Sequence, residues 1–403
     1  MKILIKFCLC LIISTFIFFS MPIFANSLVV WSPNNQTIQT NANSNSTDLQ
    51  LESGAAILID QTTGNILYDH NSHEQLRPAS VTKVMTILLI MEALDEGRIN
   101  LEDKVPCSSN ARSMGGSQIW LNETEELTVN EMLKAICVVS ANDCTVAMSE
   151  YLAGSQEAFV QKMNNRAKEL GMNDTCFKNC HGIDEDGHVT SAHDIAIMSR
   201  ELLQNHNSIT KYTTIWMDSL RDGKSQLVNT NKLVRNYTGC TGLKTGSTSL
   251  ALYNLSASAT RNGLSLIAVI MKAPSTAIRF SEAKKLLDYG FSSFEYTSFA
   301  NENDIVKKLP VNKGIQDSID VVFEKAAGTT TIKGQSANIV QNINIPDSVS
   351  APISKGQKIG EATYTLNGQT LSTINIISTS DVPKMSLLNM ASYLYKSWFS
   401  LLR

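Results

Sequence analysis

The segment 78–83 (PASVTK) places a serine hydroxyl and a lysine amine three residues apart, at Ser80 and Lys83. Residues with this spacing share one face of a helix, so the amine can reach the hydroxyl. A neutral amine in that position can accept the serine proton and make the hydroxyl a nucleophile. A serine at a helix start also lies near the positive end of the helix dipole, where an oxyanion is stabilised. Serine is a common helix N-cap, however, and a cap beside a solvated lysine explains most isolated Ser-x-x-Lys segments.

Two further motifs favour nucleophilic catalysis. The segment 140–142 (SAN) lies between two helical patterns, where a loop can present both polar side chains. The segment 244–246 (KTG) comes shortly before a predicted strand that begins near Ala251. A second lysine beside Lys83 would lower the pKa of its buried amine towards neutrality. Each motif alone is uninformative, but the three in this order, separated by 60 and 104 residues, are specific.

The three motifs together resemble those of the serine penicillin-recognising enzymes. The wider sequence is similar to one branch, the D-alanyl-D-alanine carboxypeptidases of the low-molecular-mass penicillin-binding protein 5 type. The segments that carry the similarity are ILIDQTTGNILYDHN, RPASVTKVMT, MNNRAKELGMNDTCFKNCHGI and APISKGQKIGEA, and it extends over residues 50–403. Thr241 stands where the family usually has an aspartate, and Cys180 where a proline is common. Neither departure removes a group that the chemistry needs.

The resemblance implies a serine peptidase that removes the terminal D-alanine from peptidoglycan pentapeptide stems through an acyl-enzyme on Ser80. It also implies covalent inhibition by penicillin and other β-lactams, with no cofactor and no metal. The expected catalytic residues are Ser80, Lys83 and Ser140, of which Ser140 would relay a proton to the departing amine. The backbone amides of Ser80 and Ser247 are the expected oxyanion hole. The expected substrate-binding residues are Asn142, Lys244, Thr245, Gly246, Ser247 and Arg279.

Three rival functions follow from the same pattern. A class A β-lactamase needs a glutamate that activates the deacylating water, some three dozen residues beyond the second motif. The stretch 175–179 contains no glutamate, so rapid turnover of β-lactams is not expected. A DD-endopeptidase that cuts peptidoglycan cross-links remains an alternative. A catalytically silent wall-binding protein is disfavoured because all three motifs are intact.

The strands and helices expected around the motifs indicate an α/β domain over residues 50–294. Two β-rich runs flank a Thr-Thr-Gly-Asn turn within 55–69, and an Arg-Asn-Gly turn joins two later strands at 251–259 and 264–271. Strands, helices and again paired strands favour an antiparallel sheet with helical clusters, as in the transpeptidase and β-lactamase-like fold of the resembled enzymes. Apolar periodicity predicts helices at 80–96, 129–138, 144–153, 156–170, 192–203 and 281–289.

Helical periodicity stops after Phe294. Short alternating runs follow, and Asn367-Gly368 between two of them indicates a β-hairpin. Residues 295–382 are therefore predicted to form a small all-β domain. The polar stretch 26–49 has too few apolar residues to pack and is predicted to be a disordered leader or linker.

The two ends of the chain differ from its body. Residues 1–25 combine two early lysines, an apolar run and Ala25 at a plausible cleavage point, which is the pattern of a secretory signal peptide. The apolar run is shorter than the ~20 residues of a spanning helix, so cleavage is favoured over a membrane anchor. The sequence therefore predicts an exported protein.

Residues 383–403 predict an amphipathic helix that lies on a membrane surface, here the outer face of the cytoplasmic membrane. Its cationic residues lie opposite the apolar stripe, and Pro383 separates it from the body. The alternative is a terminal helix that docks on its own domain. The stripe consists of Leu387, Leu388, Ala391, Leu394, Tyr395, Trp398, Leu401 and Leu402.

Composition and spacing exclude other classes of function. The 34 basic and 37 acidic residues of the 403-residue chain give no reason to expect nucleic acid as a partner. The GLKTGS stretch lacks the first glycine of a phosphate loop. His181, His188 and His193 follow Cys176 and Cys180 without the spacing of a metal motif, so no metal is expected there. Six cysteines beyond residue 25 are too few for a disulfide scaffold and are predicted to be buried free thiols.

Overall fold

The computed structural model describes residues 49–386, 389–391, 395 and 398. The expected signal peptide at 1–25 and nearly all of the leader at 26–49 lie outside these residues. Most of the expected apolar stripe of the tail also lies outside them. Within the described part of the chain, no helix is both long enough and apolar enough to cross a membrane.

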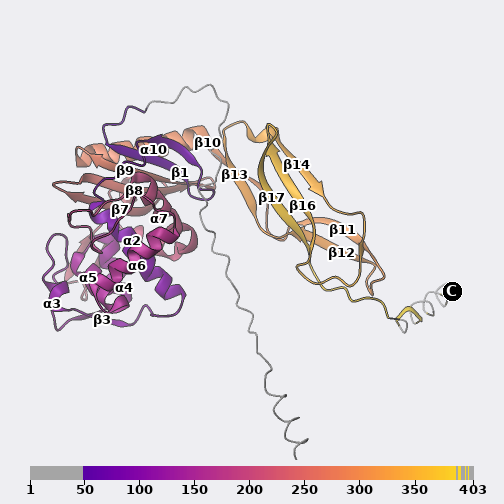
Figure 1. Cartoon of the computed structure of the whole chain (residues 1–403), viewed down its shortest axis with the longest axis horizontal. Coiled ribbons are helices and arrows are strands. Elements are labelled where there is room, and N and C mark those ends of the chain that lie inside the picture. The colour runs from indigo at the N-terminus through magenta and orange to yellow at the C-terminus, as the bar shows by residue number, and fades with distance from the viewer. Residues whose placement is uncertain (1–48, 387–388, 392–394, 396–397, 399–403) are drawn as a thin grey trace, which may run out of the picture. The chain divides into compact units, whose positions relative to one another are not determined.

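An antiparallel sheet of five strands forms the centre of the N-terminal domain, in the order β2-β1-β9-β8-β7 (Figure 1). The hairpin β1–β2 comes first in the chain, and the other three strands follow a long helical excursion. Leu58 of β1 lies opposite Ala268 of β9, so distant segments meet in the middle of the sheet. The strands are β1 (Ala55–Asp60), β2 (Ile66–His70), β7 (Cys240–Thr248), β8 (Leu252–Arg261) and β9 (Leu264–Ala273).

Both faces of this sheet are covered by helices. On β9, Leu266, Ala268 and Ile270 belong to a core that includes residues of α10 (Thr276–Ser293). The alternate residues of β9 are buried on the opposite face, where α7 (Ala192–Asn205) packs against the strand. Figure 1 shows α10 on one side of the sheet and the other labelled helices, α2 to α7, beneath it. A strand segment that is buried on both faces must be apolar, as residues 266–271 of β9 are.

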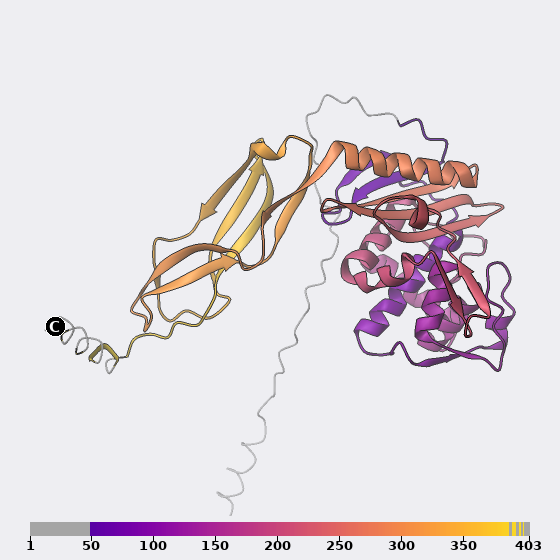
Figure 2. The ribbon, with the colours of Figure 1, turned by 180° about the vertical axis from the view of Figure 1, so that it is seen from behind.

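The helical cluster surrounds α2 (Lys83–Asp95), which is buried at nine of its thirteen positions. A helix that is apolar on almost every side belongs in the centre of a bundle rather than at its surface. Figure 2 shows this cluster from behind, on the side of the sheet away from α10. The other elements of the cluster are η1 (Ala79–Thr82), α3 (Ser109–Arg112), α4 (Val129–Val138), α5 (Asn142–Ala153), α6 (Gln156–Glu169), η2 (Asn207–Ile209) and α8 (Thr210–Thr213). The short helix α9 (Leu233–Asn236) instead shares the core of α10 on the other face. Two small antiparallel pairs of strands accompany the cluster, β3 (Lys104–Pro106) with β4 (Glu126–Thr128), and β5 (Met217–Leu220) with β6 (Ser225–Val228).

From Phe294 onwards the described chain forms a second, mainly β domain with its own core. In β16, Ala362, Tyr364 and Leu366 are buried while their neighbours are less so, which is the alternation expected of a half-buried strand. Asn367 and Gly368, both with positive φ, join β16 to β17, which confirms the predicted hairpin. The strands are β10 (Phe294–Ala300), β11 (Ile305–Asn312), β12 (Ser318–Phe323), β13 (Ala327–Ile332), β14 (Ile339–Asn344), β15 (Val349–Ser350), β16 (Lys358–Leu366) and β17 (Gln369–Ser378), with a turn of helix, η3, at Ser336–Asn338.

The predicted fold class is confirmed, but several helix boundaries differ from the sequence prediction. The helix predicted at 80–96 begins as the short helix η1, and α7 and α10 end at Asn205 and Ser293, later than predicted. Helix α10 starts five residues earlier than predicted because the hydroxyl of Ser275 accepts a hydrogen bond from the amide of Ile278 and caps the helix. Helix α5 starts at Asn142 rather than at 144. The second motif therefore spans a helix start and is not wholly a loop.

Candidate active site

Ser80 and Lys83 lie in contact at the start of the central helix. Ser80 belongs to the short helix η1, and Lys83 is the first residue of α2. The amine Nζ of Lys83 lies 3.0 Å from the hydroxyl Oγ of Ser80. The three-residue spacing thus brings the amine to the hydroxyl, and Lys83 is not a solvated surface residue, since its exposed fraction is 0%.

The other contacts of Lys83 suit a proton acceptor. Its Nζ donates to Oδ1 of Asn142 at 2.6 Å and to the carbonyl of His181 at 2.7 Å. Burial, and then the charge of Lys244, lowers the pKa of Lys83 well below its ordinary value. A neutral amine has two N–H donors and one lone pair. With both donors used by the two carbonyl oxygens, the lone pair is left for the proton of Ser80.

The second motif places Ser140 and Asn142 beside Lys83. Asn142 is held in one orientation because its Oδ1 accepts from Lys83 while its Nδ2 donates to the carbonyl of Gly115 at 2.7 Å. Ser140 lies between α4 and α5 with a positive φ. Its Oγ is buried and has no hydrogen-bond partner among the described residues. A buried hydroxyl without a partner calls for an explanation, and an available donor for a bound substrate is one.

The third motif lies on β7, the edge strand of the sheet. Lys244 is 1% exposed, and its Nζ donates to the carbonyl of Thr245 at 3.0 Å. Burial lowers the pKa of Lys244 to about 7, with Cys137 opposing the shift and Arg279 adding to it. Lys244 therefore changes charge near neutral pH, and its positive form depresses the pKa of Lys83.

Gly246 allows the backbone of β7 to lie directly against the turn that carries Ser80. A Cβ atom at Gly246 would lie 2.9 Å from the amide nitrogens of both Ser80 and Val81, and 2.8 Å from the carbonyl oxygen of Pro78. Real Cβ atoms do not come so close, so only glycine permits this approach. Ser247 follows and is exposed. The amides expected to form the oxyanion hole thus belong to two segments in close contact.

Arg279 of α10 contacts the third motif from within the protein. Its Nη1 donates to the carbonyls of Gly246 at 3.1 Å and Asn254 at 3.2 Å, and its guanidinium lies over the ring of Phe280. Burial lowers the pKa of Arg279 to about 10. Arg279 therefore supports the β7 backbone at Gly246. Its expected contact with substrate stays a prediction.

A segment that the sequence analysis did not select holds the start of α2 in place. The hydroxyl of Thr86 donates to the carbonyl of Cys180 at 2.6 Å, next to the carbonyl of His181 that receives Lys83. Gly182, with a φ of +91°, lies so close to η1 that a Cβ atom there would be 1.9 Å from the carbonyl oxygen of Ala79. These residues act through their backbone atoms, so their side-chain types did not indicate this role in the sequence.

His188 also supports the nucleophile turn. Its Nε2 lies 2.8 Å from the hydroxyl of Thr82, and its Nδ1 accepts from the amide of Lys178. Because Nδ1 accepts, the hydrogen-bond network places the ring proton on Nε2, from which it is donated to Thr82. Burial lowers the pKa of His188 to about 4, so the ring is neutral at neutral pH.

Asp143, directly after the second motif, was also missed. Its buried carboxylate accepts from the amides of Ile119 and Leu121, both at 3.1 Å, and from the amide of Cys144 at 2.9 Å. The loop that it holds contacts the second motif, since the carbonyl of Ser117 accepts from the amide of Asn142 at 2.7 Å. The available signal was an acidic residue directly before the helix predicted at 144–153.

Replacing Asp143 by alanine should loosen this loop. Two buried amides would lose their acceptor, and each unsatisfied group costs about 1–3 kcal/mol, so the free energy of unfolding should fall by roughly 3 kcal/mol. Acylation by penicillin should slow about tenfold, because the loop supports Asn142. Urea unfolding and acylation kinetics measure both effects. The exposed Asp347 provides the control: loss of the same size in Asp347→Ala would contradict the role given to Asp143.

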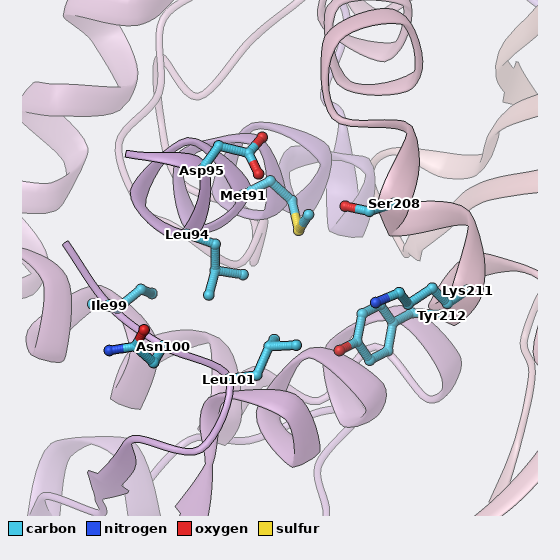
Figure 3. Close-up of a pocket in the computed structure, with 9 residues that line it drawn as sticks. All are labelled: Met91, Leu94, Asp95, Ile99, Asn100, Leu101, Ser208, Lys211 and Tyr212. Atoms are coloured by element: carbon cyan, nitrogen blue, oxygen red, sulfur yellow. The ribbon is translucent and has the colours of Figure 1, made fainter. Parts of the chain in front are cut away.

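Two cavities elsewhere in the described structure are not lined by residues of the three motifs. One of about 370 Å³ lies at the far end of α2, where Met91, Leu94 and Tyr212 line it (Figure 3). Another, of about 420 Å³, is lined by residues of α9 and the first turns of α10. The reactive residues of the motifs lie instead at the N-terminal end of α2. The six described cysteines are all free, as predicted, but only four of them are buried, because Cys176 and Cys240 are partly exposed.

Two known protein families match successive parts of the chain. Residues 39–275 match the family described as D-alanyl-D-alanine carboxypeptidase. Residues 294–384 match the family described as penicillin-binding protein 5, C-terminal domain. Together they cover both domains of the structure.

Individual relatives agree with these matches. The chain is 44% identical to the D-alanyl-D-alanine carboxypeptidase DacF of Bacillus subtilis, over 87% of this chain and 91% of that protein. The structure is similar to that of penicillin-binding protein 5 from Haemophilus influenzae, with a TM-score of 0.70 and 30% identity, over 83% of this chain and 98% of that one. It is also similar to penicillin-binding protein D2 of Listeria monocytogenes with bound ampicillin, with a TM-score of 0.56 and 29% identity, over 60% of this chain and 99% of that one.

Proposed function

Because the chain belongs to the D-alanyl-D-alanine carboxypeptidase family, we propose that Ser80, Lys83 and Ser140 carry out the serine peptidase chemistry of that family. The protein is a serine-type D-Ala-D-Ala carboxypeptidase that acts on peptidoglycan peptides and binds β-lactams. The observation that carries the assignment of residues is the buried amine of Lys83, 3.0 Å from the Ser80 hydroxyl, with its pKa lowered.

Acylation begins when Oγ of Ser80 attacks the carbonyl carbon between the two D-alanines. The proton of the hydroxyl passes to the lone pair of Lys83, and the new oxyanion accepts from the amides of Ser80 and Ser247. The C–N bond then breaks. The hydroxyl of Ser140 gives its proton to the departing amine and regains one from Lys83. D-Alanine leaves, and the shortened peptide is held as an ester.

Deacylation uses the same groups with water as the nucleophile. Lys83 takes a proton from water, the hydroxide attacks the ester carbonyl, and Ser80 recovers its proton as the peptide acid departs. Lys244 and Thr245, supported by Arg279, are suited to hold the terminal carboxylate of the substrate. Asn142 can donate to the acyl chain. In a β-lactam the broken amide stays tethered, so the leaving group cannot diffuse away and the ester persists.

Two measurements test this function. Incubation with a synthetic pentapeptide that ends in D-Ala-D-Ala should release free D-alanine. Incubation with penicillin should add the mass of the drug to the intact chain, and peptide mapping should locate it on Ser80. A folded protein that neither releases D-alanine nor forms the adduct would refute the proposal. Cleavage of a cross-linked muropeptide dimer in preference to the pentapeptide would favour the DD-endopeptidase alternative.

The two lysines should give acylation a bell-shaped pH profile. The second-order rate should rise as pH increases through the lowered pKa of Lys83, because only the neutral amine accepts a proton. It should fall above about pH 7, as Lys244 loses the charge that holds the carboxylate. In Lys244→Arg the guanidinium stays charged, so the fall near pH 7 should disappear. An unchanged descending limb in that variant would show that Lys244 is not the group responsible.

Export and membrane attachment are proposals that rest on the sequence. We propose that residues 1–25 are a signal peptide and that residues 383–403 hold the enzyme on the outer face of the cytoplasmic membrane. The large exposed fractions of Tyr395 and Trp398, 62% and 63%, support an interfacial helix, since both residue types favour the boundary of a bilayer.

A sedimentation assay checks the membrane proposal. The chain that ends at residue 382 should stay in the supernatant with vesicles of anionic phospholipid, whereas the chain that extends to 403 should pellet with them. Trp398→Ala should weaken the association several-fold, since a large interfacial side chain is lost. Equal sedimentation of the long and short chains would exclude the tail as the membrane-binding element, and would favour its docking on its own domain.

A further inference from the structure

Three metal-ligating side chains meet at a place that the carboxypeptidase chemistry does not use. His73, Asp174 and His193 each offer a ligand atom, and these atoms lie within 4.8 Å of one another. His73 precedes the nucleophile turn, Asp174 follows α6, and His193 is in the first turn of α7. Nδ1 of His73 lies 2.7 Å from Oδ2 of Asp174. The two imidazole rings lie against each other, with centroids 4.2 Å apart and planes tilted by 32°.

The surroundings resemble the supporting shell of a metal site. Ligating carboxylates and imidazoles normally have further hydrogen-bond partners that fix their orientation. Oδ2 of Asp174 accepts from the hydroxyl of Ser191 at 3.0 Å, and Nδ1 of His193 lies 3.3 Å from Oδ1 of Asp194. Asp194 is itself fixed, because its other oxygen accepts from the amide of Asp174 and the hydroxyl of Thr175.

The three side chains differ in how far they are exposed to solvent. His193 is buried, Asp174 is partly exposed, and the side chain of His73 is 63% exposed. A zinc ion held about 2.0–2.2 Å from each ligand atom needs those atoms about 3–3.5 Å apart. The ring of His73 is exposed, so it has room to turn its lone pair toward the ion. The open side leaves a position for water, as in three-ligand zinc sites.

A second cluster of candidate metal ligands is already occupied by an arginine side chain. Glu92, Glu201 and His206 also bring three candidate ligand atoms together. There the guanidinium of Arg166 donates to Glu92 and Glu201, both at 2.7 Å, and so occupies the space between the carboxylates. No lysine or arginine among the described residues forms an ion pair with Asp174.

We propose that His73, Asp174 and His193 bind a divalent transition-metal ion of the zinc type. Two imidazoles and one carboxylate suit such an ion better than calcium or magnesium, which prefer oxygen ligands. The ion joins three segments that support the catalytic turn. Leu76, three residues after His73, pairs with Thr190, and Cys176, two residues after Asp174, pairs with Val189. The ion therefore stabilises the folded chain without entering the peptidase reaction.

Titration of the full chain with Zn²⁺, followed by calorimetry, tests the proposal. The unaltered chain should bind one ion, and free Zn²⁺ a hundredfold above its dissociation constant should raise the melting temperature by about 4–5 °C. His73→Ala, at an exposed side chain, should weaken binding at least tenfold and remove most of this rise. Asp174→Asn should weaken it similarly while preserving the size of the side chain.

His206→Ala is the matched control, because it removes a histidine from the cluster that Arg166 fills. It should bind Zn²⁺ with the affinity of the unaltered chain. All variants should still form the penicillin adduct, which shows that they are folded and separates this test from that of the peptidase function. Equal affinity in His73→Ala would place the ion at another site, such as the thiols common to every variant, and overturn the proposal. So would an unaltered chain that binds no Zn²⁺.

Discussion

Replacing Lys83 by alanine should slow the acylation of Ser80 by at least about a thousandfold, the scale on which a positioned general base contributes. The amine is the proton acceptor nearest to the hydroxyl, at 3.0 Å, and its other contacts hold it there. Arginine at this position should be equally inactive, because a guanidinium keeps its charge and has no lone pair to accept the proton. The rate of adduct formation with penicillin, followed by intact mass, measures the loss.

Two controls separate loss of the base from loss of structure. Ser80→Ala lacks the nucleophile and should form no adduct at all. Lys168→Arg, at an exposed position of α6, should acylate at the normal rate. If Lys83→Arg acylated as fast as the unaltered chain, a positive charge alone would suffice and the general-base role would be wrong.

Replacing Gly182 by alanine should disturb both stability and catalysis, although the residue contributes no side chain. Its new methyl group would lie 1.9 Å from the carbonyl oxygen of Ala79, so one of the two backbones must move. Such a shift displaces Ser80, and a misplacement of about 1 Å can cost a hundredfold in rate. We expect the free energy of unfolding to fall by more than about 3 kcal/mol, measured by urea, and the acylation rate to fall about a hundredfold.

Gly171 provides the matched control for this variant. Its φ of +76° is similar to that of Gly182, but a Cβ atom there would meet nothing within 4 Å. Gly171→Ala should therefore lose only the about 1–2 kcal/mol of a left-handed backbone with a side chain, at normal acylation rate. Equal losses in the two variants would mean that backbone strain, and not the contact with Ala79, explains the effect.

Local patterns were sufficient to predict most of the elements and the three motifs. The helix at 129–138 has the predicted limits, and the hairpin at Asn367-Gly368 is where its turn residues indicated. Both depend on neighbours within a few residues, which determine periodicity, capping and turn type. The contact between Ser80 and Lys83 is of the same kind, because three residues on a helix suffice to bring the two side chains together.

The groups that act through distant contacts escaped sequence analysis. His73 and Asp174 are 101 residues apart, and no local spacing links them. Gly182 matters because it lies against the backbone of Ala79, and Asp143 matters because its carboxylate accepts from the amide of Leu121. Residue types alone do not reveal such contacts. The sequence prediction of no metal considered His193 with the histidines near it in the chain, but its proposed partners His73 and Asp174 lie outside that stretch.

The sequence by itself determined which side chains can react, their order, and the elements that carry them. The tertiary structure decided their protonation. Lys83 can serve as a base because Asn142 and His181, 59 and 98 residues away, enclose its amine and because Lys244 repels its charge. A pKa depends on the water removed and the charges brought near, and both come from segments remote in the chain.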